Sequence, residues 1–281
     1  MPEENATALP ATSSVPPDFP EKQRKLFQEV LAVMNEHQVP YAVSGAFALH
    51  QHTGIWRYTK DLDLFLTRQD VPAALQLLQQ KGYVCEVCDA VWLAKAHRDD
   101  FYVDLITGMS NGVISVDASW IRRAQSAMVV GVKTRVMSPE ELIASKLFVT
   151  RRERFDGADI AHVIYGTKGK IDWERVLALV GEHWEILLWA LIFFRYAYPA
   201  HTDYVPFKLW EDLLTRYMAL VSKKDDKAKF RGSLLDENMF AIDMKEWGLD
   251  NVLADYRTQH AAKPPQVESQ QPVLGEQPKI A

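Results

Sequence analysis

The pattern of apolar and polar positions divides the chain into a first half that mixes helices with strands and a second half that is helical. Leu26, Phe27, Val30, Leu31 and Met34 recur at helical spacing and predict one amphipathic helix. Runs of β-forming residues predict strands over 41–44, 60–66, 83–87, 91–96, 101–106 and 128–136, with helices over 46–52 and after residue 70. From residue 138 onward the period is helical, including 173–180, 183–196 and 207–221. The pattern predicts an α/β (α+β) fold in which a small mixed sheet precedes a helical domain.

Both ends of the chain differ in composition from its middle. Residues 1–20 combine proline with serine and threonine, and residues 262–281 combine proline with glutamine. Such segments have too few apolar residues to form a packed core. We therefore predict disordered tails over 1–20 and 259–281, a core domain over 21–137 and a helical domain over 138–258.

The predicted strand over 60–66 carries two aspartates. Because side chains alternate along a strand, Asp61 and Asp63 share one face and the leucines between them share the other. Two neighbouring carboxylates repel each other unless a cation or a proton lies between them, and hard oxygen ligands suit Mg²⁺ or Mn²⁺ together with substrate phosphates. An isolated Asp-x-Asp is more often a solvated polar face, so the surrounding sequence has to support the metal.

The segment before this strand is typical of an anion site. A short apolar strand ends at Ser44, Gly45 allows a tight turn, and a helix can begin directly after it. The first N–H groups of a helix and its positive dipole end attract phosphate. The alternative is a tight strand-to-helix connection that binds nothing.

A third carboxylate, Asp104, interrupts the apolar run over 101–106. Charges are seldom buried without a partner, and a metal shared with Asp61 and Asp63 would supply one. The alternative is a residue that caps the turn before Thr107-Gly108.

A capped helix is predicted to start at Ser138. Ser138 at the N-cap, Pro139 at the first position and Glu141 at the third form a capping box. Lys146 then lies on the same helix face as its apolar residues, so its stem would cover apolar surface while its ammonium group reaches a phosphate. A surface lysine is the alternative.

Taken in order, these motifs resemble a known superfamily. Ser44-Gly45, the run over 59–64 and the run over 103–106 are similar to the nucleotidyltransferases that include the polymerase-beta-like and aminoglycoside enzymes. The runs over 138–147 and 154–160 are most similar to the bacterial branch with the toxins of abortive-infection toxin–antitoxin systems. The resemblance covers roughly residues 25–165. The segments over 231–235 and 246–248 also resemble this group, without an assigned role.

The resemblance implies roles for several residues. Asp61, Asp63 and Asp104 would be the catalytic and metal-binding acids, and Ser44, Gly45, Lys146 and Asp156 would bind the nucleotide. Asp159 would either start the following helix or pair with Arg151, Arg152 or Arg154. One departure concerns the phosphate turn, which is usually Gly-Gly or Gly-Ser and is Ser44-Gly45 in this chain, although a serine hydroxyl can still donate to phosphate.

The predicted reaction is the transfer of a nucleoside monophosphate group from an NTP, such as ATP, to the hydroxyl of an acceptor. The ion would be Mg²⁺ or Mn²⁺, and Asp104 would complete a second metal site or act as the base. RNA, a small molecule or a protein remains open as the acceptor. Two alternatives are a catalytic toxin, with an antitoxin protein as partner, and a nucleotide-binding regulatory protein without catalysis.

Charge and cysteine content add limits to this prediction. A net charge of -5 argues against broad, nonspecific binding to nucleic acid. Cys85 and Cys88 have no further metal ligands nearby in sequence and fit thiols in a reducing cytoplasm. The first 20 residues lack the apolar core of a signal peptide, and the apolar run over 186–194 is too short to span a bilayer. We therefore predict a cytoplasmic protein without a membrane segment.

Overall fold

The computed structural model describes residues 19–260. The predicted tails over 1–20 and 259–281 therefore lie outside the described residues, except at their inner ends. At the first of these ends, Phe19 is buried and stacks on Phe47 at a centroid distance of 5.7 Å. At the second, residues 259 and 260 belong to the last helix. The described chain thus begins and ends in packed structure.

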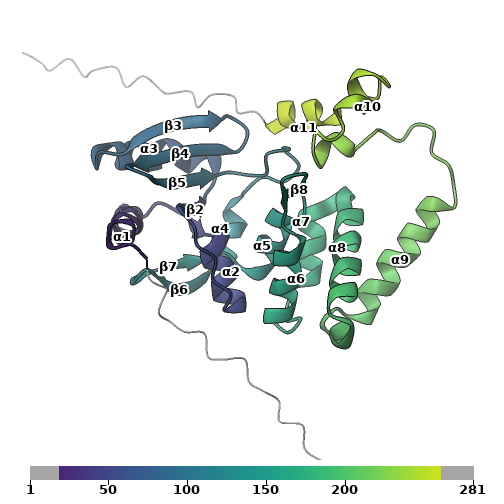
Figure 1. The fold of residues 1–281 in the computed structure, drawn as a ribbon, viewed down its shortest axis with the longest axis horizontal. Helices are drawn as coiled ribbons and strands as arrows, with labels where there is room; N and C mark the ends of the chain where they lie inside the picture. Colours follow the sequence, from purple (N-terminus) through teal and green to yellow (C-terminus); the bar gives the residue numbers. More distant parts are fainter. Residues whose placement is uncertain (1–18, 261–281) are drawn as a thin grey trace, which may run out of the picture.

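A seven-stranded sheet forms the first half of the described chain, in the order β3-β4-β5-β2-β1-β7-β6 (Figure 1). Its strands are β1 (Ala42–Val43), β2 (Asp61–Phe65), β3 (Val84–Asp89), β4 (Leu93–Arg98), β5 (Phe101–Ile106), β6 (Gln125–Val129) and β7 (Val132–Val136). The pairs β2–β5 and β1–β7 are parallel, and the other neighbours are antiparallel. The predicted α/β fold with a mixed sheet is confirmed.

The central strands are fixed by their apolar faces. Leu62 and Leu64 of β2 and Val103 and Leu105 of β5 are fully buried. Helices α1 (Glu21–Glu36) and α3 (Val71–Gln80) contact each other and the sheet, and the five apolar residues that predict α1 are all buried. The alternation of these strands leaves their polar side chains on the opposite face.

The second half of the chain is helical, as predicted. Its helices are α5 (Pro139–Lys146), α6 (Gly157–Gly166), α7 (Trp173–Val180), α8 (Trp184–Ala197), α9 (Phe207–Val221), α10 (Ala241–Lys245) and α11 (Val252–His260). Helices α6, α8 and α9 lie side by side, and α2 (Gly45–Thr53) from the first half packs against α5 and α6 (Figure 1). The helix that follows Gly45 therefore joins the sheet to the helical half.

Three local predictions differ from the structure. The run over 128–136 is a hairpin of β6 and β7 rather than one strand, because Val130 and Gly131 both adopt positive φ (45° and 85°) and turn the chain. Helix α4 (Ala118–Arg123) and the short hairpin of β8 (Thr150–Arg151) and β9 (Arg154–Phe155) were not expected. The capping box at Ser138 is altered, since its hydroxyl contacts the side chains of Glu140 and Glu141 instead of capping the backbone.

Helices α7 and α8 form the most apolar part of the chain. By length and composition alone, the stretch Trp173–Ala197 is able to cross a membrane, with a mean hydropathy of 1.7, as are core helices of soluble proteins. Its helical course is interrupted at Gly181, where φ is 52° and ψ is -122°. Leu187, Leu191 and Phe194 are fully buried within the protein. The prediction of a buried helix is thus confirmed for one face of α8 only, because Trp189 and Ile192 are 44% and 49% exposed.

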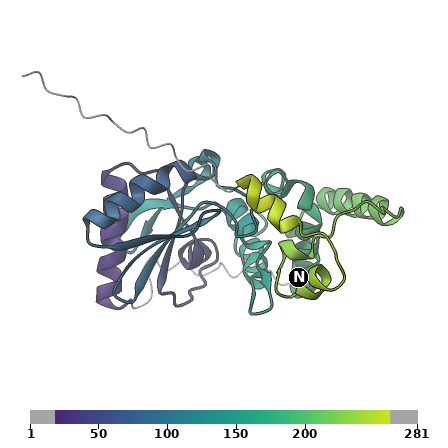
Figure 2. The ribbon, with the colours of Figure 1, turned by 90° about the horizontal axis from the view of Figure 1, so that it is seen from above.

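The last segment of the described chain returns to the sheet. Helix α11 lies across the junction between the sheet and the helices (Figure 2). The Asn111 side chain donates to the carbonyl of Leu234 at 2.9 Å, and Arg257 binds both carboxylate oxygens of Asp89 at 2.9 and 3.1 Å. Gly112, at φ 73°, permits close approach, since a Cβ atom there would lie 3.0 Å from the backbone of Tyr256. The C-terminal segment is therefore docked on the loop that follows β5.

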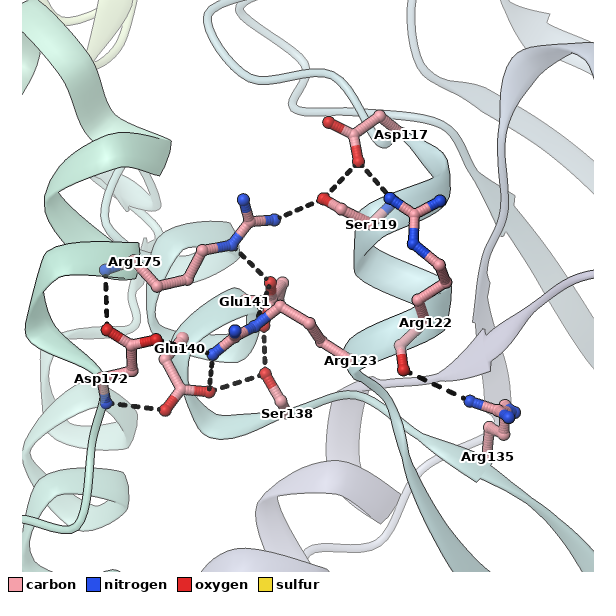
Figure 3. A network of polar contacts seen from close by, with 10 residues as sticks. All are labelled: Asp117, Ser119, Arg122, Arg123, Arg135, Ser138, Glu140, Glu141, Asp172 and Arg175. Carbon is pink, nitrogen blue, oxygen red and sulfur yellow. Dashed lines mark hydrogen bonds and ion pairs between the residues drawn. The ribbon is translucent and has the colours of Figure 1, made fainter.

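A buried charge network joins α4, α5 and α7 (Figure 3). Glu141 is fully buried and accepts a hydrogen bond from Arg175 at 2.8 Å, while Arg123 lies 3.5 Å away. Arg175 also donates to Ser119, and Glu140 accepts from the backbone N–H of Asp172 at 2.9 Å. The network fixes α5 between the two halves of the molecule.

Replacement of Glu141 by Gln should destabilise the protein. The variant keeps the shape of the side chain but removes the charge that pairs with Arg175, while Arg123 still has Asp172 at 3.1 Å. Loss of the buried partner of Arg175 should lower the free energy of unfolding by about 2–4 kcal/mol. Urea-induced unfolding followed by circular dichroism measures this loss. Glu174→Gln, at an exposed position of α7, is the matched control and should change little. An equal effect of both variants would contradict a role for the network.

Candidate active site

One cavity of about 190 Å³ lies between the sheet and the helical half. Its lining includes six of the seven predicted site residues, namely Ser44, Gly45, Asp63, Asp104, Lys146 and Asp156. Asp61 is half-buried on the same face of β2 but is not part of the lining. The structure thus brings together residues from β2, β5, α2 and α5 that are far apart in sequence.

Asp63 and Asp104 are directly opposite each other on the parallel strands β2 and β5. This pairing concentrates negative charge at the cavity. Burial of Asp63, followed by the charges of Asp104 and Asp61, raises the pKa of Asp63 to about 6. The positive charges of Lys146 and Arg154 act in the other direction and lower the pKa of Asp63. Asp63 therefore carries a charge that its surroundings only partly balance.

Asp104 has a direct partner that the sequence analysis missed. Lys95 of β4 is opposite Asp104 in the antiparallel pair β4–β5, and its Nζ lies 3.0 Å from Oδ1 and 3.1 Å from Oδ2. Burial raises the pKa of Asp104, and the ammonium group of Lys95 opposes that shift. The one signal in the sequence is the short connection between β4 and β5. It predicts a hairpin, in which Lys95 and Asp104 can pair across the two strands.

The fit of a divalent ion differs among the three acids. Asp61 and Asp63 offer hard oxygen donors on one strand face, and Asp63 carries a partly unbalanced charge, which suits Mg²⁺ or Mn²⁺. Asp104 is already neutralised by Lys95. Within residues 19–260, no three His, Cys, Asp or Glu side chains are grouped closely enough to hold a metal ion. A metal shared by all three acids therefore stays a prediction.

Gly45 touches the carboxylate of Asp63. It adopts a φ of 57°, and a Cβ atom at this position would lie 1.8 Å from Oδ2 of Asp63. The backbone N–H of Ser44 donates to the carbonyl of Asp63 at 2.9 Å, which fixes the turn against β2. Only glycine suits this position, both for its backbone conformation and for the space available. The first N–H groups of α2 consequently begin beside the acids.

The hydroxyl of Ser44 does not point to a ligand. It is buried and donates to the sulfur of Met137 at 3.5 Å. The side chain also makes no capping bond to α2. Any phosphate at this turn would therefore meet backbone N–H groups rather than the serine hydroxyl considered from the sequence.

Lys146 is buried in an ion cluster. Its Nζ lies 2.8 Å from Asp156 and 2.8 Å from Asp159, and all three residues are buried. Asp159 is in the first turn of α6, as one alternative predicted, but it pairs with Lys146 and Arg57 rather than with a neighbouring arginine of the chain. The ammonium group thus borders the cavity with its charge already shared.

Two arginines that were not predicted as site residues also line the cavity. Arg154 donates two hydrogen bonds of 3.0 Å to Asp156, and Arg151 donates to the hydroxyl of Ser110 at 2.7 Å. Burial acts to raise the pKa of Asp156, but the bonds from Arg154 and Lys146 lower it overall. Both arginine side chains come from the unexpected β8–β9 hairpin and are exposed. The cations of the lining, Arg151, Arg154 and Lys146, therefore come from the helical half, whereas Asp63 and Asp104 come from the sheet.

A sequence match identifies the protein family to which the chain belongs. Residues 23–185, more than half of the chain, match the model of the family described as "Nucleotidyl transferase of unknown function (DUF2204)". The chain belongs to this family. The protein is therefore an enzyme that transfers nucleotidyl groups, and the predicted superfamily is confirmed. The abortive-infection branch stays a prediction.

Three solved structures that match the chain are distant from it in sequence. The solution structure of the antibiotic-resistance factor ANT(2'')-Ia is 18% identical over 65% of this chain and 97% of its own, with a TM-score of 0.41. The lincomycin-bound lincosamide antibiotic adenylyltransferase LnuA is 18% identical over 52% of this chain and 97% of its own, with a TM-score of 0.37. An antigenic nucleotidyltransferase-like protein from Paracoccidioides brasiliensis is 16% identical over 65% of this chain and 93% of its own, with a TM-score of 0.43. No curated protein matches the chain.

Replacement of Asp63 by Asn should stabilise this nucleotidyl transferase at high pH. Because the pKa of Asp63 is raised to about 6, the folded state favours the protonated carboxyl group, and this contribution is lost as the pH rises through about 6. At pH 8 the variant removes a poorly solvated charge, and its free energy of unfolding should exceed that of the wild type by roughly 1–3 kcal/mol. Near pH 4 the two proteins should be almost equal.

Thermal unfolding of both proteins between pH 4 and pH 8 measures this difference. Asp250→Asn, at an exposed position, is the control for loss of one negative charge. A variant that is less stable than the wild type at pH 8 would show that the Asp63 carboxylate is balanced within the protein.

Proposed function

We propose that this enzyme transfers a nucleoside monophosphate group from an NTP, such as ATP, to an acceptor hydroxyl in the cavity described above. The observation that carries the proposal is that acids and cations line one cavity. Asp63 and Asp104 come from the sheet, Arg151 and Arg154 come from the β8–β9 hairpin, and the start of α2 also lines the cavity. A polyphosphate needs cations and N–H donors, and its bound metal needs carboxylates.

The nucleotide phosphates would lie beside these cations. Free N–H groups of the first turn of α2 would face them, because Gly45 brings this turn directly against Asp63. Arg151 has an exposed guanidinium group that can bind phosphate oxygens in pairs, whereas Arg154 already donates two hydrogen bonds to Asp156 and would offer only its remaining N–H groups. Lys146 would contribute its charge at the base of the cavity and hold Asp156, which in turn orients Arg154.

The three aspartates would have two different roles. Asp61 and Asp63 would hold Mg²⁺ or Mn²⁺, which when bound offsets the negative charge of the phosphates. Asp104 would accept the proton of the acceptor hydroxyl, and Lys95 would orient the carboxylate for this role. The acceptor oxygen then bonds to the α-phosphorus atom as the bond to pyrophosphate breaks.

Substitution of the acids should separate binding from transfer. Asp61→Asn and Asp63→Asn should weaken the Mg²⁺-dependent affinity for NTP by about tenfold or more, since each removes a charged ligand. Asp104→Asn should retain nucleotide affinity and lose transfer by about 100-fold or more, since it removes the base. Calorimetric titration with each NTP and Mg²⁺ measures affinity. Mass spectrometry of RNA, small metabolites and proteins after incubation with NTP measures transfer.

Asp250→Asn should match the wild type in both measurements. If the wild type binds none of the four NTPs in the presence of Mg²⁺ or Mn²⁺, the proposed function fails. If Asp104→Asn transfers as fast as the wild type, only the assignment of the base fails.

The toxin and the regulatory protein stay as alternatives. A catalytic toxin should arrest growth when expressed alone, with rescue by an antitoxin encoded beside it, and Asp63→Ala should abolish the arrest. A regulatory protein should keep its cellular effect in the same variant. Growth curves of cells that express each form separate the two. A cytoplasmic location, where NTP is available, remains part of the prediction.

A further inference from the structure

The C-terminal segment, residues 231–260, holds the loop that follows β5 at two consecutive residues. Arg257 donates a hydrogen bond to the carbonyl of Ser110, and the side chain of Asn111 donates to the carbonyl of Leu234 at 2.9 Å. The C-terminal segment lies beyond the part of the chain that matches the family model. The position of Ser110 therefore depends on residues that are far from it in sequence.

Ser110 makes a second contact, which belongs to the active-site cavity. Its hydroxyl accepts a hydrogen bond from Nη2 of Arg151 at 2.7 Å, and both residues line this cavity. Arg151 is the exposed cation to which the proposed function assigns phosphate binding. Ser110 thus connects two arginines, because its carbonyl accepts from Arg257 while its hydroxyl accepts from Arg151.

The C-terminal segment also holds the backbone beside Arg151. Asp236 accepts a hydrogen bond from the backbone N–H of Arg152 at 3.2 Å. The carboxylate of Asp236 is itself fixed, since it accepts from the backbone N–H groups of Asn238 at 2.8 Å and Met239 at 3.2 Å. The side chain of Arg151 and the backbone that follows it are therefore both tied to the C-terminal segment.

Asp89 fixes and neutralises Arg257. Nη2 of Arg257 lies 2.9 and 3.1 Å from the two carboxylate oxygens of Asp89, at the end of β3, while Nη1 donates to the carbonyl of Ser110. The planar guanidinium group suits such a double role, because its N–H groups point in fixed directions. Arg257 thus attaches α11 to both β3 and the loop that follows β5.

The apolar attachment of the C-terminal segment is small. Leu234, Val252 and Leu253 are the buried residues of an apolar cluster that is separate from the main core. Because a small cluster contributes little burial, the polar contacts described above carry a large share of the attachment. A segment held in this way can open locally at a lower free energy than the whole protein needs to unfold.

We propose that Arg257 and Asp236 are positioning residues for the nucleotide site and hold Arg151 in the conformation that binds phosphate. This role rests on the proposed function, because it requires Arg151 to contact the nucleotide. A side chain that is already ordered loses less conformational entropy when a ligand binds, so the affinity for the ligand rises. The C-terminal segment thus increases nucleotide affinity through Ser110 and the backbone of Arg152.

A double-mutant cycle with ATP and Mg²⁺ tests the proposal. Arg257→Gln should weaken ATP binding by about fivefold, since Arg151 then has to be ordered by the nucleotide. Arg151→Gln should weaken it by about tenfold, because it removes a charged phosphate contact. The double variant should bind ATP as Arg151→Gln does, since Arg257 acts through Arg151. Calorimetric titration of the full chain measures the affinities, and Arg216→Gln, at an exposed position of α9, is the matched control.

Ser110→Ala gives a second route to the same answer. It removes the hydroxyl that holds Arg151 and keeps the carbonyl that accepts from Arg257, so ATP binding should weaken by about fivefold while the C-terminal segment stays docked. Hydrogen exchange followed by mass spectrometry reports the docking. The amide of Arg152 should exchange about tenfold faster in Arg257→Gln, and at the wild-type rate in Ser110→Ala and Arg216→Gln. Melting temperatures show whether each variant folds.

The possible results distinguish this proposal from the proposed function. Independent effects, with the double variant about fiftyfold weaker than the wild type, would overturn the positioning role. Unchanged exchange of Arg152 in Arg257→Gln would do the same. If Arg257→Gln does not fold, Ser110→Ala decides, and wild-type affinity for ATP in that variant would overturn the proposal. A wild type that binds no NTP would instead refute the proposed function on which this role rests.

Discussion

The parallel pairing of β2 with β5 is the constraint on which the candidate site depends. It places Asp63 directly opposite Asp104 in a partly desolvated cavity, where two negative charges raise the free energy of the folded state. Lys95 neutralises one of them from the neighbouring strand. Asp63 keeps an excess of charge, so an arriving cation would relieve a repulsion that is built into the sheet. The candidate site thus lowers the stability of the folded state.

Buried ion pairs hold helix α5, which contributes to the lining of the cavity. Lys146 binds Asp156 and Asp159 at one end of α5, and Glu141 binds Arg175 near the other end. Buried ion pairs add little net stability, but loss of one partner leaves an uncompensated charge. The position of α5 is therefore strictly defined, and with it the distance between the acids of the sheet and the arginines of the β8–β9 hairpin.

The C-terminal segment, although distant in sequence, packs beside the candidate site. After α9 the chain crosses back and docks α11 on the loop that follows β5, the strand of Asp104 (Figure 2). Gly112 allows this contact because any side chain there would meet the backbone of Tyr256. Residues beyond the segment that matches the family model thus form a wall beside the active site.

The sequence by itself determined what depends on local spacing. The limits of β5, α7 and α9 are as predicted, because a single period of apolar residues defines each of these elements. The acidic motifs, which are also local, identified the superfamily. Only the tertiary structure decided which charges meet. The pairing of Lys95 with Asp104 requires the strand register, the burial of Lys146 requires α6, and the bond from Asn111 to Leu234 requires the return of the C-terminal segment. Periodicity reports which face of an element is buried, whereas contacts between elements depend on how the whole chain packs.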